Sequence, residues 1–375
     1  MQHLSRQLGA SYGIILVMKC REIHDKLVKD IISGVYTKDG RLPSEASLAA
    51  SFGASRMTLR AALEELRRQG LIEKRNGTGS FLTRRAFRRS GLIGLVIPDY
   101  ADFEFFTAVE DEVKRHARRL GYHVELLFTQ KRSRDAIVLD MRRKVRKLAV
   151  ARVEGVIFRP FVTESLAAAN KEIVDIFRHA EVPVVLIDSD ITQPPRRSDC
   201  DLVAIDNISA GRQIAGHLYE RGYRRIAFLM QNRSPFANAN WGDRLFGLAG
   251  ELALRGCEES VRQLDFSATD ANALGALLRS RRKPDAIVCG NDEQAAHLME
   301  TLAVLGKHAP EDVAVVGFDD IALARSTTPP LTTISQPVKK LASTAFKSLL
   351  ARIRYPNNDP REILLDAPLV IRQST

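Results

Sequence analysis

The chain has 375 residues, of which 45% are apolar and 27% are charged, a composition typical of a folded protein with two or three domains. Its longest early apolar run, Ile14–Met18, is too short for a membrane-spanning helix or a signal peptide, so we expect a cytoplasmic location and no membrane partner. Four scattered cysteines predict free thiols and no metal site. The sequence contains no catalytic or phosphate-binding motif, which argues against an enzyme and predicts no cofactor.

The net charge of +11 is concentrated at one end of the chain. Residues 1–90 hold 17 Lys and Arg against 8 Asp and Glu, a net charge of +9, whereas the remaining 285 residues carry only +2. A positive surface binds the phosphates of nucleic acid, but it suits an anionic membrane equally well. Charge alone therefore does not choose between DNA and lipid.

The pattern of residues 41–83 favours DNA over lipid, because it predicts a winged helix-turn-helix. Apolar residues at helical spacing end at Phe52, and a turn at Gly53 precedes a second helix that Ser55 would cap. Two strand-like runs follow, Leu71–Arg75 and Ser80–Thr83, joined by a segment that begins with Asn76 and Gly77. An Asn-Gly pair between such runs is a strong hairpin signal, and this hairpin would form the wing.

The segment from about residue 20 to residue 83 resembles the DNA-binding domain of the GntR family. The matching motifs are Leu42–Glu45, Phe52–Arg60, Gly70–Ile72 and the wing glycines Gly77 and Gly79. The resemblance implies that six residues lie at the DNA: Ser44, Glu45, Arg56, Thr58, Arg60 and Gly77. Arginine can donate two hydrogen bonds to one guanine, which suits this role. The alternative for the two arginines is an ordinary solvated helix face.

These patterns divide the chain into four segments. Residues 1–18 form an N-terminal extension without an assignable pattern, and residues 19–83 form the winged helix-turn-helix. Residues 84–90 contain four arginines and are interpreted as a basic linker that either contacts DNA phosphates or is simply solvated. Residues 91–375 form a two-lobed domain for effector binding and dimerisation.

The last segment alternates strand-like and helical patterns, which predicts a doubly wound α/β fold. The strands are short continuous apolar runs, typical of parallel strands covered on both faces. They are expected at Leu92–Ile97, His123–Phe128, Gly155–Phe158, Val182–Ile187, Leu202–Ile205, Arg225–Met230, Ala286–Cys289 and Val313–Phe318. Helices are expected at Phe105–Leu120, Ala136–Ala149, Ile173–His179, Ser209–Arg221, Arg244–Arg255, Ala271–Arg281 and Glu293–Leu305. About eight such units suit two similar lobes rather than one sheet.

This segment is similar to the effector domain of LacI/GalR regulators, which is itself similar to periplasmic sugar-binding proteins. The landmarks occur in family order: Asp188, Ile205–Asn207, Gly211, Gly222–Phe228, Arg244–Gly247, Asn291–Asp292, Val316–Asp320 and Pro329–Pro337. The resemblance implies a periplasmic-binding-protein-like fold whose chain crosses between the lobes near residues 205 and 335. With its GntR-type head, the whole chain resembles the arabinose-repressor kind of hybrid regulator.

Ligands of open α/β sheets bind beyond the carboxyl ends of the strands, and several polar residues follow predicted strands. Arg244, Asn291 and Asp319 occupy such positions, and the resemblance implies that they lie in a sugar cleft together with Gln336. On the facing lobe, Phe105 and Phe106 match positions that line the pocket in similar proteins, and their rings could stack on a sugar. Arg159 follows another strand; if it faces the cleft together with Arg244, an acidic or phosphorylated effector becomes possible.

Several of these residues have structural alternatives. Asn291 is equally suited to cap a helix, and the two phenylalanines could simply pack in the core of their lobe. The neighbouring Asp292 and Asp320 are expected to brace turns rather than to contact ligand.

The sequence as a whole predicts a DNA-binding transcription regulator, a repressor whose operator affinity is controlled by a sugar or sugar derivative bound between the lobes. We expect a homodimer, because one small head makes too few base contacts for useful specificity and two heads fit a pseudo-palindromic operator. One alternative is a corepressor-dependent regulator or an activator of the same architecture. Another is a sugar-binding module without DNA function.

Overall fold

The structure is a computed structural model. It describes residues 19–31, 35–36, 40–75, 78–83, 90–98, 104–131, 133–151, 153–192, 196–230, 239–257 and 261–375. The N-terminal extension, the wing glycine Gly77 and most of the basic linker lie outside the described residues. Within these ranges, no helix is long and apolar enough to cross a membrane.

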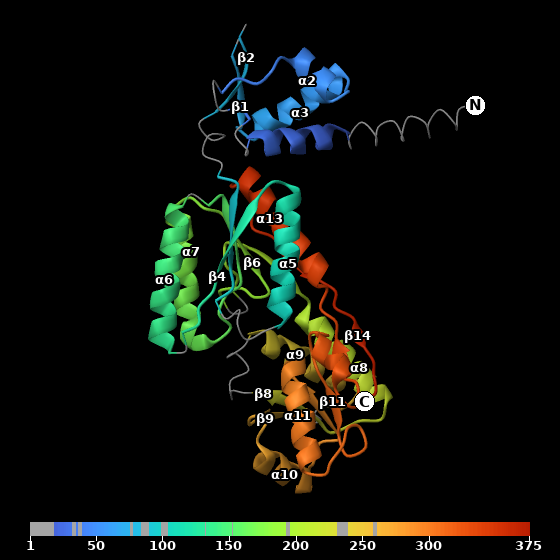
Figure 1. Ribbon diagram of the computed structural model, residues 1–375. Helices are drawn as coiled ribbons and strands as arrows, with labels where there is room; N and C mark the ends of the chain where they lie inside the picture. Colours follow the sequence, from blue (N-terminus) through green and yellow to red (C-terminus); the bar gives the residue numbers. More distant parts are fainter. Residues whose placement is uncertain are drawn as a thin grey trace, which may run out of the picture.

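The head consists of a first helix at residues 19–31 followed by the elements of a winged helix-turn-helix (Figure 1). These elements are α2 (Glu45–Ser51), α3 (Arg56–Arg68) and the antiparallel strands β1 (Ile72–Arg75) and β2 (Gly79–Leu82). Ser55 caps α3, as predicted, because its hydroxyl oxygen accepts a hydrogen bond from the backbone N–H of Thr58 at 3.1 Å. The buried side chains Leu59, Ala62 and Leu66 close the core of the head.

The N-lobe is built on a six-stranded parallel sheet in the order β13-β7-β6-β5-β3-β4. Helices α5 and α13 pack on one face of this sheet and α6 and α7 on the other (Figure 1). The strands are β3 (Leu92–Val96), β4 (His123–Leu127), β5 (Gly155–Phe158), β6 (Val184–Ile187), β7 (Asp201–Ile205) and β13 (Glu362–Leu365). The helices are α5 (Glu104–Arg119), α6 (Arg134–Val150), α7 (Ala167–His179) and α13 (Val338–Arg354).

The C-lobe repeats this plan around a four-stranded parallel sheet in the order β11-β10-β8-β9. Helices α8 and α9 cover one face, and α10 and α11 cover the other. The strands are β8 (Ile226–Met230), β9 (Val261–Asp265), β10 (Ala286–Cys289) and β11 (Ala314–Val316). The helices are α8 (Asn207–Glu220), α9 (Ala239–Leu254), α10 (Ala271–Arg279), α11 (Asp292–Val304) and the short α12 (Ala322–Ser326). The two sheets confirm the predicted α/β class.

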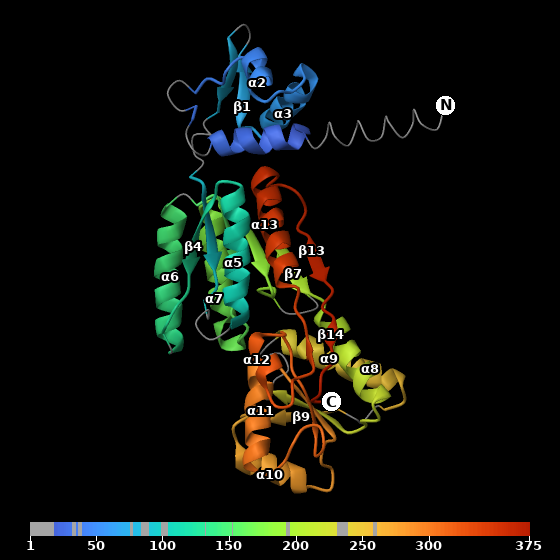
Figure 2. The same ribbon diagram turned by 45° about the vertical axis from the view of Figure 1, so that its right-hand side comes forward.

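The chain passes between the lobes three times (Figure 2). It enters the C-lobe after β7 and returns through β12 (Thr333–Ile334) into α13. It then adds β13 to the N-lobe sheet and passes back to β14 (Leu369–Val370), which pairs antiparallel with β12. Only the first two passages were predicted from the sequence, and β9, β13, α12, α13 and the small β12–β14 pair were not predicted.

Candidate ligand and DNA sites

In the head, the polar residues predicted to contact DNA gather where α2, α3 and the wing meet. The hydroxyl oxygen of Ser44 accepts a hydrogen bond from the backbone N–H of Ser47 at 3.2 Å and thereby caps α2. The next residue, Glu45, accepts a hydrogen bond from Arg60 Nε at 2.8 Å. This hydrogen bond is the largest cause that holds the pKa of Glu45 below its usual range. Arg60 therefore has a protein partner when no DNA is bound, and Glu45 orients it.

The other predicted DNA-binding residues lie at the beginning of α3. Arg56 is its first residue and is exposed. Thr58 is only 4% exposed, and its hydroxyl lies 2.8 Å from that of Ser55, so it supports the helix cap from inside. Two basic residues that sequence reasoning missed, Arg41 and Lys74, line the hollow between α2 and the wing. Their position beside the Leu42–Glu45 motif and on the wing strand was the available signal.

Arg244 of α9, the central residue of the candidate site between the lobes, is only 4% exposed. Its Nε donates to Asn207 Oδ1 at 2.9 Å, and its Nη1 donates to the carbonyl oxygen of Gly290 at 2.6 Å. The guanidinium carbon lies 3.3 Å from the centre of the Phe318 ring. Burial lowers the pKa of Arg244 to about 10, against the attraction of nearby carboxylates, the strongest of which is Asp319. The guanidinium remains charged at neutral pH and is held in one orientation.

Close packing of α8 on α9 sets this orientation. A Cβ atom added to Gly211 would lie 2.1 Å from the carbonyl oxygen of Arg244, and one added to Gly247 would lie 2.0 Å from that of Ile208. The two helices thus touch backbone to backbone, and only glycine permits this approach. The contact brings Asn207, at the beginning of α8, within hydrogen-bond distance of Arg244.

Asp319 and Gln336 form a second polar group at the carboxyl end of the C-lobe sheet. Gln336 Nε2 donates to Asp319 Oδ1 at 2.6 Å, and Asp319 adopts a φ of 115°, which is unusual for a residue other than glycine. Burial raises the pKa of Asp319 to about 7, although Arg244 opposes this effect. The buried Gln336 Oε1 has no hydrogen-bond partner among the described residues, and neither does the Nε2 atom of the buried Gln294.

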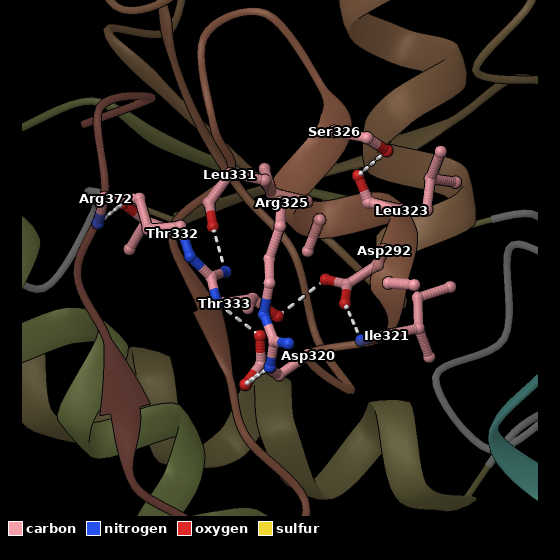
Figure 3. A network of polar contacts seen from close by, with 12 residues as sticks. Asp292, Asp320, Ile321, Leu323, Arg325, Ser326, Leu331, Thr332, Thr333 and Arg372 are labelled. Atoms are coloured by element: carbon pink, nitrogen blue, oxygen red, sulfur yellow. Dashed lines mark hydrogen bonds and ion pairs between the residues drawn. The ribbon is translucent and has the colours of Figure 1, made fainter. Parts of the chain in front are cut away.

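The neighbouring acids brace the site, as expected (Figure 3). Asp292 is fully buried and accepts hydrogen bonds from Thr333 Oγ1 at 2.6 Å and from the backbone N–H of Ile321 at 3.0 Å. Asp320 forms ion pairs with Arg372 and Arg325. Asn291 caps α11, because its Oδ1 accepts from the backbone N–H of Gln294 at 2.8 Å. Its oxygen is therefore engaged in the structural role that was the alternative to ligand binding.

On the N-lobe side, Arg159 is paired with Asp188, a residue that the site prediction left out. Arg159 Nε donates to Asp188 Oδ2 at 3.3 Å, and its guanidinium lies 4.6 Å from the centre of the Phe106 ring. Asn240 of α9 reaches across from the C-lobe and donates from Nδ2 to Asp188 Oδ1 at 3.0 Å. Phe105 and Phe106 are each 5% exposed and belong to the core, with Phe106 beneath Arg159. The structure thus brings Arg159 to the interlobe region with its charge already balanced.

The raised carboxylate pKa values predict a pH dependence of stability. Burial, followed by the charge of Asp319, raises the pKa of Asp292 to about 8 from its ordinary value of 3.8. Because the folded protein then binds more protons than the unfolded chain between these values, its stability should fall as the pH rises from about 4 to about 8. Asp292→Asn should flatten this slope, with a difference of about 1–3 kcal/mol across the range.

Urea unfolding at several pH values between these limits would measure the slope. Asp312→Asn is the control, because the pKa of Asp312 is held low by a hydrogen bond from Lys307 and its contribution has the opposite sign. Parallel pH profiles for the unaltered protein and Asp292→Asn would contradict the prediction.

Comparison with known proteins identifies the two kinds of domain in this chain. A family model for bacterial regulatory proteins of the gntR family matches residues 19–82, and one for a periplasmic binding protein-like domain matches residues 215–375. The HTH-type transcriptional repressor PurR of Vibrio atlanticus is 31% identical over 288 residues, which cover 76% of this chain and 80% of that protein. This chain belongs to the LacI-type transcription regulators.

The resemblance of this LacI-type regulator to one relative extends over its head as well. The arabinose metabolism transcriptional repressor of Geobacillus stearothermophilus is 26% identical over 372 residues, 95% of this chain and 97% of that protein. Among solved structures, a LacI family regulator from Enterococcus faecalis with bound ribose is 26% identical, with a TM-score of 0.61 over 76% of this chain and 98% of that one. The complex of the regulator CelR with cellobiose has a TM-score of 0.65 at 23% identity, over 89% of this chain and all of that one, and shows the shared fold. This LacI-type regulator therefore carries a GntR-type DNA-binding head.

Proposed function

We propose that the protein is a cytoplasmic, non-catalytic repressor whose operator affinity is lowered by a neutral sugar bound between the lobes. In this proposal residues 19–83 bind DNA and residues 91–375 bind the effector and form a homodimer. The arrangement of Arg244, Asp319 and Gln336 is the observation that carries the effector part. A guanidinium that Asn207 and Gly290 hold in one orientation, beside a carboxylate and an amide, suits the hydroxyls of a polyol.

The charge balance of the site favours a neutral ligand over an acidic one. Arg159 is already paired with Asp188, so its positive charge is engaged and not available to a phosphate or carboxylate. Arg244 in turn lies among four carboxylates, of which Asp319 acts on it most strongly. An anionic effector would meet these acids and displace an existing pair, whereas a neutral polyol donates hydroxyl protons to them. The relatives with bound ribose and cellobiose support the same class.

Fluorescence anisotropy of the protein on DNA from its own upstream region, with competitor DNA present, tests the proposal. A neutral pentose, hexose or disaccharide should weaken specific binding by about 5- to 150-fold, the usual range of coupling between two sites. Uronates and sugar phosphates of the same size serve as matched controls and should have no effect. If only a charged sugar released the protein from DNA, the proposal of a neutral effector would be contradicted. If a sugar instead tightened DNA binding, the protein would be a corepressor-dependent regulator or an activator.

A further inference from the structure

Tyr355 belongs to residues 91–375, which we call the body, and it contacts α3, the recognition helix of the head in the proposed function. The hydroxyl of Tyr355 donates to Glu65 Oε1 at 2.8 Å. Tyr355 immediately follows α13 of the N-lobe, and Glu65 lies in the last turns of α3, the helix that begins with Arg56. The two residues are 290 positions apart in the sequence, so this contact joins separate parts of the fold.

Inside the head, the contact continues as a chain of hydrogen bonds. Gln69 Nε2 donates to the same Glu65 oxygen at 2.7 Å and approaches His24 Nε2 at 2.8 Å. His24 Nδ1 lies 2.9 Å from Asp25 Oδ1. Because His24 and Gln69 are only 4% and 2% exposed, their side chains have little room to turn. Tyr355 is therefore connected through α3 to the first helix of the head.

Apolar contacts surround this connection. Figure 2 shows residues 19–31 lying across the upper ends of α5 and α13. Val28 of this first helix lines a small gap together with Leu120, Leu350 and Ile353 of the N-lobe. A Cβ atom added to Gly121 would come within 3.0 Å of the side chain of Lys29, so the stem of Lys29 rests on that turn. The first helix of the head thus packs against the end of the N-lobe that is made by α13 and the turn after α5.

The end of α13 that bears this surface is fixed to the N-lobe sheet. A Cβ atom added to Gly155 would lie 2.7 Å from Leu349 and 3.1 Å from Ile353, so α13 packs directly on the backbone of β5. At its other end, α13 begins two residues after Gln336, whose side chain donates a hydrogen bond to Asp319 in the candidate site. With 17 residues the helix is about 25 Å long and spans the N-lobe from this site to the head.

We propose that Tyr355 is a positioning residue through which the body fixes the orientation of the recognition helix. Because α13 moves with the N-lobe, the orientation of α3 follows that of the N-lobe as long as the Tyr355–Glu65 contact holds. In the homodimer of the proposed function, on which this inference rests, the distance between the two recognition helices is then set by the bodies. Loss of the contact leaves the heads to adjust independently to their half-sites.

Tyr355→Phe removes only the hydroxyl that makes the contact. Glu65→Ala removes the acceptor, whereas Glu65→Gln retains an oxygen there and should behave like the unaltered protein. Tyr219→Phe, on α8 of the C-lobe, is the matched control for loss of a tyrosine hydroxyl. Two properties of the full chain are measured. The first is solution X-ray scattering without DNA. The second is affinity for an operator selected from random DNA, compared with versions that carry one or two extra base pairs between the half-sites.

The scattering of the unaltered protein should match the arrangement in which the head contacts the N-lobe. Its affinity for the lengthened operators should fall by about tenfold or more, because half-site spacing must match the distance between the heads of the dimer. The Tyr355→Phe and Glu65→Ala proteins should have a larger maximum dimension, and their affinity should fall by less than about threefold on the lengthened operators. Identical scattering and identical spacing dependence in the unaltered protein and Tyr355→Phe would overturn the proposal. If no protein bound DNA specifically, the proposed function would fail, while the scattering comparison would still decide the role of Tyr355.

Discussion

Arg244→Ala is expected to abolish the response of DNA binding to the effector, with at least about 100-fold weaker effector binding. The substitution removes the guanidinium that Asn207 and Gly290 hold in one orientation, and it leaves Asp319 without its main positive neighbour. Isothermal titration with the effector, followed by operator binding with and without it, measures both consequences. Operator affinity in the absence of effector should remain close to that of the unaltered protein.

Because Arg244 is buried, its removal also lowers stability, by about 3–5 kcal/mol if the acids are left uncompensated. Arg244→Lys therefore accompanies the test: it keeps the charge, lacks the paired donors and should still bind effector at least about tenfold more weakly. Arg212→Ala on α8 is the control, since that arginine is surface-exposed and paired with Glu251. If the effector still released a folded Arg244→Ala protein from its operator as it does the unaltered protein, Arg244 would not be an effector-binding residue.

Arg56→Ala should weaken specific operator binding by about 10- to 100-fold, as expected for the loss of one arginine contact to a base. Arg56 begins α3 and is exposed beside the N-cap, where the N-terminal end of a recognition helix enters the major groove. Competition anisotropy with operator and unrelated DNA separates the loss of specificity from a general loss of charge. A base contact lowers the ratio of the two affinities, whereas a phosphate contact leaves it unchanged.

Arg67→Ala is the matched control, because it removes the same charge from the other end of the same helix, where Arg67 is paired with Glu64. It should reduce both affinities slightly and leave their ratio unchanged. Equal effects of the two substitutions would favour the solvated-face interpretation of Arg56 and, with it, the alternative of a sugar-binding module without DNA function.

The sequence predicted most strands because a buried parallel strand is a continuous apolar run. β5, β6, β7, β8 and β10 are such runs, with all residues buried. The missed strand β9 lies at a sheet edge and buries mainly Leu264 among polar residues, so it lacks a continuous apolar run. The edge strand β13 was missed although three of its four residues are apolar. The omission of α13 has no such reason, because Leu341, Ala345 and Leu349 are apolar at helical spacing.

The candidate site was predicted less completely, because spacing along a chain does not tell which side chains meet. Strand ends indicated Arg244, Asp319 and Arg159, and the structure places all three near the junction of the lobes. It does not follow from any local pattern that Asp188 balances Arg159 or that Asn240 reaches Asp188 across the lobes. Those contacts depend on how α9 sits against β6, which is decided by packing of distant segments.

The third passage between the lobes has a consequence for how the protein is made. During synthesis the head can fold as soon as residues up to about 83 have emerged, since its core lies within that segment. The N-lobe sheet, in contrast, stays open at β7 until β13 is available, and one of its faces is covered only by α5 until α13 has been made. The C-lobe strands lie between these pieces in the sequence. A nascent chain therefore exposes an unpaired strand edge almost to the end of translation, and such an edge can pair with other chains.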